Sequence, residues 1–359
     1  MDRHRRLVTS SVLVALAITV AACGSDSKPA ATTASSVGAG PVAATSPTTV
    51  RLGYFPNITH APALVGVEKG FFQQELGQHT LKTSTFNAGP EAIDAIFADA
   101  LDATFIGPNP AINAFQKSNG DAIRIVAGST SGGAGLVVKP EITTVEGLKG
   151  KKIATPQLGN TQDVALRAFL ESKGLSTDTS GGGDVSIAPQ ANADTLTGFA
   201  PRDIDGAWVP EPFFTRLQQE SGGKVLVDEK SLWPDGQFVT THLIVATKFL
   251  NAHPDAVLGL IRGEDAAIKF IEDSPADAQK AANSGIEKVT GKPLKEAVLT
   301  AAFANLKFTL DPVASSLRKS ADDAYAIGLL KSADIDGIYD LTLLNKQLKD
   351  SGQPEVTGL

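Results

Sequence analysis

Cysteine is almost absent from this sequence, since Cys23 is the only one among 359 residues. A single cysteine excludes a disulfide framework, a CxxC redox pair and a thiolate metal cluster. Basic residues are also few: 32 Lys and Arg stand against 39 Asp and Glu, so the formal net charge is −7. Because nucleic-acid binding needs a basic surface, this balance argues against a nucleic-acid partner.

Catalytic and metal-binding motifs are lacking as well. The five histidines are scattered, and no pair has HxxxH or HExxH spacing. The sequence contains no GxSxG, Walker A or GxGxxG motif. We therefore expect a binding protein without a metal or a cofactor, and not an enzyme.

The overall composition is that of a globular protein. Hydrophobic residues make up 42% and charged residues 20% of the chain. These values exclude a disordered chain, a coiled coil and a polytopic membrane protein. At roughly 150 residues per domain, the length suggests two lobes, each large enough to bury a core.

The first 22 residues have the pattern of a lipoprotein signal peptide. Three arginines precede residues 7–22, which form an uncharged run of 16 residues. Such a run is short for a bilayer span and suits a signal-peptide core. It ends in Val-Ala-Ala-Cys at 20–23, which resembles a bacterial lipobox, so we predict cleavage before Cys23 and acylation of Cys23. The alternative is an ordinary secretory signal with a chance cysteine.

A linker is expected at residues 23–49. Of residues 24–49, 22 of 26 are Ala, Gly, Pro, Ser or Thr, a composition typical of a flexible chain. Together with acylated Cys23, this linker would hold the protein at the extracytoplasmic face of the cell membrane. Cleavage would leave 29 basic and 38 acidic residues and a net charge of −9.

Strands and helices alternate from residue 50 onward, which predicts an α/β fold with mostly parallel sheets flanked by helices. In the first unit the expected strands are 50–55, 81–86, 103–106 and 123–127, and the expected helices are 63–76, 90–98 and 110–116. In the second unit the expected strands are 152–155, 185–188, 206–209 and 225–227, and the expected helices are 161–173, 192–199 and 213–220.

A strand at 243–246 and a long helical region after 250 follow the second unit. We therefore expect lobe 1 to comprise residues 50–138 and 240–359, and lobe 2 to comprise 139–239. The chain would cross between the lobes near 138 and again near 240, as in a clamshell. Two independent domains in series are the alternative.

Glycines and small polar residues follow the predicted strands. Open α/β sheets bind ligands at the carboxyl ends of their strands. Helix N-termini and neutral donors at those ends suit a small anion, although the same residue types also form ordinary turns. The candidate ligand-binding residues are Phe55, Asn57, His60, Gly89, Pro108, Asn109, Ser129, Ser131, Gly132, Gly159, Asn160, Thr161, Gln162, Trp208 and Glu211. A structural role fits Trp208 and Glu211 equally well.

Residues 52–62 and 66–72 resemble the opening of solute-binding proteins for aliphatic sulfonates, whose relatives bind taurine or nitrate for ABC importers. The resemblance spans about residues 50–320 and continues at 86–90, 107–110, 154–163 and 207–212. It implies a type II periplasmic-binding-protein clamshell. It also implies a monomer that closes on an aliphatic sulfonate or a similar small anion and delivers it to ABC permease subunits. Some relatives clamp the anion with a charged side chain, but none of these loops contains an arginine.

Other ligands stay open at this point, namely nitrate or bicarbonate, taurine, and a pyrimidine precursor. The same superfamily includes the eukaryotic synthases of the thiamin pyrimidine precursor. Those enzymes depend on a cysteine-rich motif and an active-site histidine. A chain whose only cysteine is Cys23 does not fit that pattern.

We predict that Cys23→Ser abolishes lipid labelling and moves the protein from the membrane fraction to the soluble fraction. Metabolic labelling with a palmitate analogue and cell fractionation measure the two effects. Continued membrane attachment of Cys23→Ser would place the anchor elsewhere in the chain.

Overall fold

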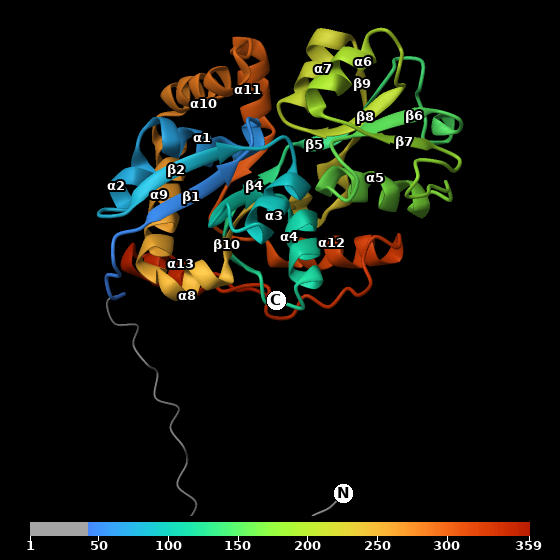
Figure 1. The fold of residues 1–359 in the computed structure, drawn as a ribbon. Coiled ribbons are helices and arrows are strands. Elements are labelled where there is room, and N and C mark those ends of the chain that lie inside the picture. The colour runs from blue at the N-terminus through green and yellow to red at the C-terminus, as the bar shows by residue number, and fades with distance from the viewer. Residues whose placement is uncertain (1–41) are drawn as a thin grey trace, which may run out of the picture. The chain divides into compact units, whose positions relative to one another are not determined.

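A computed structural model describes residues 42–359. The expected signal peptide, Cys23 and most of the expected linker lie outside the described residues. The chain divides into Met1–Gly40 and Pro41–Leu359, and the description below concerns the second unit alone. It contains two β-sheets, each covered by helices, which form two lobes (Figure 1). No helix within residues 42–359 is both long and apolar enough to cross a membrane.

The first lobe is built on a six-stranded sheet with the order β11-β4-β10-β3-β1-β2. Four of its strands run in one direction, and β10 and β11 run in the other. Its strands are β1 (Thr49–Tyr54), β2 (Thr80–Thr85), β3 (Ala103–Ile106), β4 (Ile123–Gly132), β10 (Val239–Ala246) and β11 (Leu306–Phe308).

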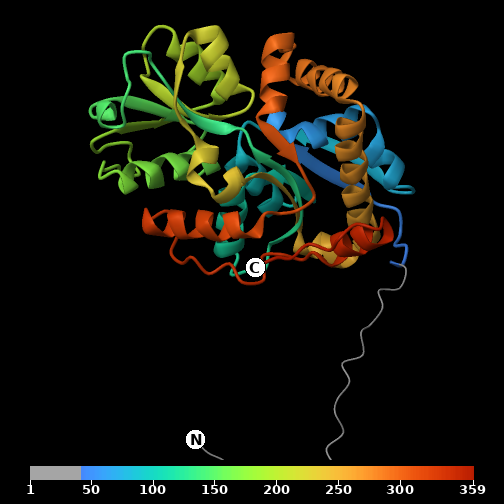
Figure 2. The same ribbon diagram turned by 180° about the vertical axis from the view of Figure 1, so that it is seen from behind.

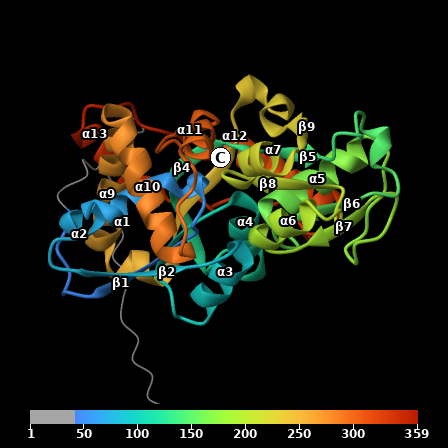
Figure 3. The same cartoon turned by 90° about the horizontal axis from the view of Figure 1, so that it is seen from above.

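The second lobe is built on a five-stranded sheet with the order β7-β6-β8-β5-β9. Only β5 runs against the other four strands. Its strands are β5 (Ala134–Val138), β6 (Lys152–Thr155), β7 (Ser186–Pro189), β8 (Gly206–Pro210) and β9 (Lys224–Asp228). The predicted two-lobed α/β architecture with mostly parallel sheets is confirmed, and Figure 3 shows the second lobe, in green and yellow, beside the first.

Helices cover both sheets. The first lobe carries α1 (Ala61–Glu68), α2 (Phe71–Glu75), α3 (Gly89–Phe97), α4 (Pro108–Lys117), α8 (Thr247–Ala252), α9 (Pro254–Asp273), α10 (Pro275–Thr290), α11 (Glu296–Ala304), α12 (Ala314–Ala326) and α13 (Thr342–Asp350). The second lobe carries α5 (Thr161–Ser172), α6 (Asn192–Phe199) and α7 (Phe213–Ser221). Helix α12 packs against both α4 and α5 and so lies across the two lobes (Figure 2).

The chain passes between the lobes at Gly132–Gly133 and returns just before Val239. Gly132 and Gly133 have φ values of 87° and 73°, a left-handed conformation that glycine adopts without strain. The N–H of Gly132 donates to the carbonyl oxygen of Phe238 at 3.1 Å, so the two crossing segments are tied to each other. The first crossing thus lies before residues 134–138, which form β5 of the second sheet.

Three elements differ markedly from the sequence-based expectation, and one is the strand expected at 243–246, which begins at Val239. The helix expected at 63–76 is divided into α1 and α2, because Gly70 between them adopts a φ of 76°. The strand expected at 123–127 continues to Gly132, because β10 and β11 pair with β4 on its two sides. Residues 129–132, expected in a loop, are therefore strand residues.

The end of the expected linker contacts the first lobe. The N–H and the hydroxyl of Thr45 donate to the Asp255 carboxylate, each at 2.7 Å. His79 Nε2 lies 3.1 Å from Oδ2 of the same carboxylate. Residues from 45 onward are therefore fixed to the N-terminal end of α9 before β1 begins at Thr49.

The core of the first lobe contains an unusual glutamate. Glu264 on α9 is fully buried, and neither of its carboxylate oxygens has a hydrogen-bond partner among the described residues. Burial raises the pKa of Glu264 well above its usual value of 4.5, nearby Ser129 offsets part of this rise, and the charge of Asp265 adds to it. Glu264 is therefore held in its neutral, protonated form within this core.

This burial predicts a pH-dependent stability. Above pH 4.5 the unfolded chain releases the Glu264 proton while the folded protein retains it. The free energy of unfolding therefore falls as the pH rises, by about 1.4 kcal/mol per pH unit at most. We expect Glu264→Gln to melt higher than wild type at pH 8, with a difference that shrinks toward pH 4.5. Calorimetry from pH 4 to 8 measures this, with Glu287→Gln on the exposed side of α10 as the control. An equal difference at every pH would contradict it.

Candidate functional site

A small cavity lies between the two lobes. Its volume is about 20 Å³, close to the space that one water molecule needs. Both lobes contribute to its wall. The lining residues are Phe55, Asn57, Thr59, His60, Asn87, Ala88, Gly107 and Thr240 from the first lobe, and Pro156, Asn160, Thr161, Gln162, Asn192 and Pro210 from the second.

The lining residues come almost entirely from the carboxyl ends of parallel strands. In the first lobe they follow β1, β2 and β3, and in the second they follow β6 and β7 or end β8. The strand-end argument from the sequence thus places the cavity where open α/β sheets bind their ligands.

Helix N-termini meet at this cavity. Ala88, Gly107 and Asn160 are the N-cap residues of α3, α4 and α5, and Asn192 is the first residue of α6. None of these four helices has a side-chain cap hydrogen bond. Backbone N–H groups of a first helical turn have no partner inside the helix. Pro90 in α3 and Pro108 and Pro110 in α4 carry no N–H, so the free first-turn donors come mainly from α5 and α6, while all four helix N-termini contribute partial positive charge.

Two buried polar side chains at the cavity have no partner. Thr161 Oγ1 and Asn192 Oδ1 are inaccessible to solvent and make no hydrogen bond among the described residues. Thr161 is 6% and Asn192 7% exposed. A buried polar atom without a partner costs free energy in the folded state. Thr161 Oγ1 can donate or accept a hydrogen bond and Asn192 Oδ1 can only accept one, so both atoms are open to a partner from outside the described chain.

His60 contributes a neutral imidazole to the wall. Burial lowers the pKa of His60 to about 3, so the ring carries no charge at neutral pH. Its Nδ1 accepts a 3.4 Å hydrogen bond from the N–H of Phe55, which leaves the ring proton on Nε2. His60 can thus donate a hydrogen bond without adding a charge.

Charged side chains are missing from this wall. Of the fourteen lining residues within the described chain, none is Asp, Glu, Lys or Arg. Glu91, which bonds to the lining residue Asn87, accepts hydrogen bonds at both carboxylate oxygens. Its Oε1 accepts from Gln157 Nε2 at 2.8 Å across the lobes, and its Oε2 accepts from the Asn87 N–H at 3.1 Å.

A buried network fixes the N-terminus of α5. Asp163 is fully buried and accepts hydrogen bonds from Gly159 N at 2.9 Å, Thr155 Oγ1 at 2.9 Å and Arg167 Nε at 3.0 Å. Arg167 offsets the charge that Asp163 places beneath this helix end. The turn at Gly159–Asn160 is thereby held, while the first N–H groups of α5 stay free.

Glycine permits the two lobes to meet at this cavity. A Cβ atom on Gly107 would lie 2.3 Å from Thr161 Oγ1 in the opposite lobe. A Cβ atom on Gly89 would lie 3.3 Å from Asn160 Oδ1, also across the lobes. Because the enclosed volume is so small, a ligand larger than water reaches these groups only when the lobes move apart.

The structure brings six of the predicted ligand-binding residues to the cavity. They are Phe55, Asn57, His60, Asn160, Thr161 and Gln162. Three further predicted residues adjoin this wall without lining it: Gly89 begins α3, Pro108 begins α4, and Gly159 precedes the α5 cap.

Three predicted residues lie instead at the crossing between the lobes. Ser131 Oγ accepts from the N–H of Phe238 at 3.2 Å, and Gly132 is the last residue of β4. Glu211 is fully buried, accepts from Asn305 Nδ2 at 2.7 Å, and has its pKa raised by burial. Because Asn305 belongs to the first lobe, Glu211 ties the lobes together beside the crossing.

The remaining predicted residues are structural. Trp208 is fully buried in the second lobe, where its Nε1 donates to Glu229 Oε2 at 2.7 Å, and burial raises the pKa of Glu229 to about 7. Asn109 Nδ2 donates to the carbonyl oxygen of Ser320 on α12 at 3.1 Å. Ser129 is a buried residue of β4 that faces Glu264.

The sequence reasoning missed several lining residues, of which Asn192 is the most informative. Asn192 opens α6 directly after the short strand β7, so the rule applied to the other strand ends would have found it. Thr240 lies at the expected second crossing between the lobes, inside strand β10, where the sequence has no turn residues that would indicate a site. The other lining residues that were not singled out lie in the loops that carry the predicted resemblance; they are Thr59, Asn87, Ala88, Gly107, Pro156 and Pro210.

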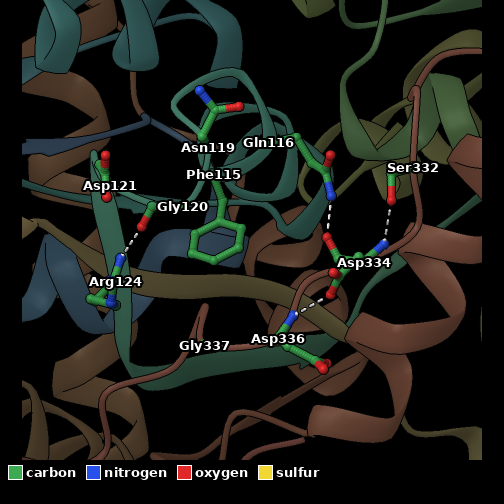
Figure 4. A pocket seen from close by; sticks show the side chains of 10 residues that line it. All are labelled: Phe115, Gln116, Asn119, Gly120, Asp121, Arg124, Ser332, Asp334, Asp336 and Gly337. Carbon is green, nitrogen blue, oxygen red and sulfur yellow. Dashed lines mark hydrogen bonds between the residues drawn. The ribbon is translucent and has the colours of Figure 1, made fainter.

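A larger hollow of about 470 Å³ lies on the first lobe, next to the C-terminal end of α4 (Figure 4). Its polar groups bond to one another: Arg124 Nη1 donates to the Gly120 carbonyl oxygen at 2.5 Å, and the Asp336 N–H donates to Asp334 Oδ1 at 3.0 Å. The carboxyl ends of the strands do not line this hollow. Among residues 42–359, no group of His, Cys, Asp and Glu is placed to hold a metal ion.

Comparison with known proteins assigns the chain to a family. The model of the NMT1-like family matches residues 43–285, which include every residue of the cavity wall. The chain belongs to the NMT1-like family. The predicted likeness to sulfonate-, taurine- and nitrate-binding proteins is confirmed by the relatives and by a solved nitrate-binding protein of the same fold.

Three relatives illustrate the NMT1-like assignment. A putative aliphatic sulfonates-binding protein of Bacillus subtilis is 24% identical over 84% of this chain and 88% of its own. The taurine-binding periplasmic protein of Escherichia coli is 26% identical over 65% of this chain and 70% of its own. The alkanesulfonate-binding protein of Xanthomonas axonopodis pv. citri bound to MOPS superposes with a TM-score of 0.69 at 21% identity, over 81% of this chain and 96% of the other.

These relatives are binding proteins and not enzymes. The NMT1-like chain is accordingly a solute-binding protein related to the binding components of ABC importers. Its fold is the two-lobed α/β fold of periplasmic binding proteins.

The contact between Gly107 and Thr161 generates a prediction. Gly107 has φ −71° and ψ 162°, which alanine adopts without strain, so a methyl group there interferes only with the opposite lobe. We expect Gly107→Ala to weaken ligand binding at least tenfold while the melting temperature of the unliganded protein changes little. Calorimetric titration and thermal melting measure the two effects.

Gly147→Ala is the matched control, because Gly147 is exposed and a Cβ atom there meets no atom closer than 3.6 Å. Small-angle scattering adds a second readout, since Gly107→Ala should compact less than wild type on ligand addition. Unchanged affinity in Gly107→Ala would show that this contact has no part in closure.

Proposed function

We propose that this protein captures a small organic anion, most simply an aliphatic sulfonate, between its lobes and delivers it to the permease of an ABC importer. One observation carries the proposal. A wall without charged side chains gathers the N-termini of α3, α4, α5 and α6 around the unpartnered hydroxyl of Thr161. Helix N-termini and neutral donors bind anions without a cationic side chain.

The relatives support the same ligand class. Proteins similar to this chain are named for aliphatic sulfonates, taurine and alkanesulfonate. We further propose that the protein works outside the cytoplasm, anchored through Cys23, and partners with permease subunits. The leader sequence and the periplasmic relative support this location.

Calorimetric titration with a ligand panel tests the proposal. The panel contains ethanesulfonate, propanesulfonate, taurine, nitrate, bicarbonate and a hydroxymethylpyrimidine. We expect an organic sulfonate to bind tightest. Binding of nitrate or bicarbonate alone would support anion binding but reject an organic sulfonate as the ligand. Preferred binding of the neutral pyrimidine would reject the hypothesis that the protein binds an anion.

The role of Thr161 gives a sharper prediction. Thr161→Val keeps the shape of the side chain and removes the unpartnered hydroxyl, so the unliganded protein should melt no lower than wild type. A hydrogen bond to a charged group is worth about 1.5–3 kcal/mol, so anion affinity should fall roughly ten- to a hundredfold.

Ser131→Ala is the contrasting variant. Because Ser131 Oγ accepts from Phe238 N and lies outside the wall, its loss should cost about 1 kcal/mol of stability and leave affinity unchanged. If Thr161→Val instead bound the anion as tightly as wild type, the hydroxyl would not be a ligand contact.

A further inference from the structure

One hydrogen bond joins the two lobes directly beside the cavity. Gln157 Nε2, in the second lobe, donates to Glu91 Oε1, in the first lobe, at 2.8 Å. Gln157 follows Pro156, which lines the cavity, and Glu91 also accepts from the lining residue Asn87. The bond thus connects the cavity wall of one lobe with the cavity wall of the other.

This bond lies far along the sheet from the crossing between the lobes. Glu91 belongs to α3, which follows β2, and β2 is an edge strand of the first sheet. Three strands separate β2 from β4, through which the chain leaves the first lobe. When two lobes turn about a hinge, the groups farthest from the hinge move apart most. Opening of the lobes therefore breaks the bond between Glu91 and Gln157.

Glu91 is positioned for this contact by its own lobe. Its Oε2 accepts from the Asn87 N–H at 3.1 Å and from Asn87 Nδ2 at 3.3 Å. Glu91 is the third residue of α3, where the helix dipole favours a carboxylate. Because these interactions lie within the first lobe, they do not depend on closure. Little side-chain freedom is then lost when Oε1 meets the second lobe.

The Gln157 amide makes no other hydrogen bond. Among the described residues its Nε2 bonds only to Glu91, and its Oε1 is buried without a partner. A hydrogen bond from an amide to a carboxylate is stronger than one between two neutral groups. The contact across the lobes is therefore the one interaction that holds this side chain in the closed structure.

Other bonds between the lobes are placed differently. Glu211 accepts from Asn305 beside the crossing, where opening moves the lobes least. Lys295 Nζ lies 3.0 Å from Glu220 Oε1, but the lysine side chain is 73% exposed, so solvent screens this pair and it contributes little. Neither bond involves a residue that adjoins the cavity wall.

We propose that Glu91 and Gln157 form a latch that holds the lobes closed over a bound ligand. This inference rests on the proposed function and deepens it, because it names the contact that regulates ligand retention at the same site. The latch forms only when the lobes close, and it breaks before the ligand leaves. A hydrogen bond to a charged group favours the closed state over the open state roughly ten- to a hundredfold.

Exchange of the two partners tests the latch. Gln157→Glu places two carboxylates opposite each other, and their repulsion opposes closure. We expect this variant to bind propanesulfonate roughly tenfold more weakly, or weaker still, in calorimetric titrations. It should also compact less than wild type at saturating propanesulfonate in small-angle scattering. Adding Glu91→Gln lets the new amide donate to the new carboxylate, so the double variant should recover most of the lost affinity and compaction.

Leu158→Glu is the matched control, because it adds the same charge at an exposed neighbouring residue outside the cavity wall. It should bind propanesulfonate as wild type does, and melting curves of all variants exclude a folding defect as the cause.

Three results would overturn the latch and leave the proposed function intact: wild-type affinity in Gln157→Glu, equal weakening in Leu158→Glu, or no recovery in the double variant. Failure of the wild-type protein to bind propanesulfonate would instead reject the proposed function, and the latch with it.

Discussion

The carboxyl ends of the parallel strands in the two sheets face a common space, and this constraint places nearly every group that lines the inter-lobe cavity. Each helix that follows such a strand begins at the same edge, so its free N–H groups point where the strand ends. Residues far apart in the chain, such as Gly107 and Thr161, meet for this reason. The chemistry of the wall is thus largely a backbone property, and side chains such as Thr161 and Asn192 refine it.

The strands that break the parallel pattern serve the connection between the lobes. After β4 of the first sheet the chain enters β5, which runs antiparallel to its neighbour β8 in the second sheet. On its return the chain forms β10, which pairs antiparallel with β4. Around this crossing, Ser131 accepts a hydrogen bond from the Phe238 N–H, and Glu211 accepts one from Asn305. Glu211 and Asn305 at the crossing join the lobes, whereas Thr161 and Asn192 in the wall each keep one buried atom without a partner among the described residues.

Sequence periodicity and turn residues were enough to predict the lobes and most strands and helices, because alternation of apolar segments is a local signal. They also predicted six of the lining residues, from Phe55 to Gln162, because strand ends are visible in sequence. Ser131 and Gly132 were misplaced, since their glycine-rich stretch looks like a loop and becomes strand only through pairing with β10 and β11. Trp208 and Glu211 found buried partners distant in sequence, Glu229 and Asn305. Such pairings depend on tertiary packing and leave no local signal.

The uncharged wall of the cavity also determines how the protein responds to ionic strength. Interactions between exposed charges are screened within about 10 Å at 0.1 M salt, whereas buried interactions are screened far less. A ligand held by enclosed backbone dipoles therefore keeps its residence time when the salt concentration changes. The acidic surface, with a net charge of −7, repels an approaching anion most strongly in dilute solution. For the proposed anion, added salt would thus speed capture without loosening retention.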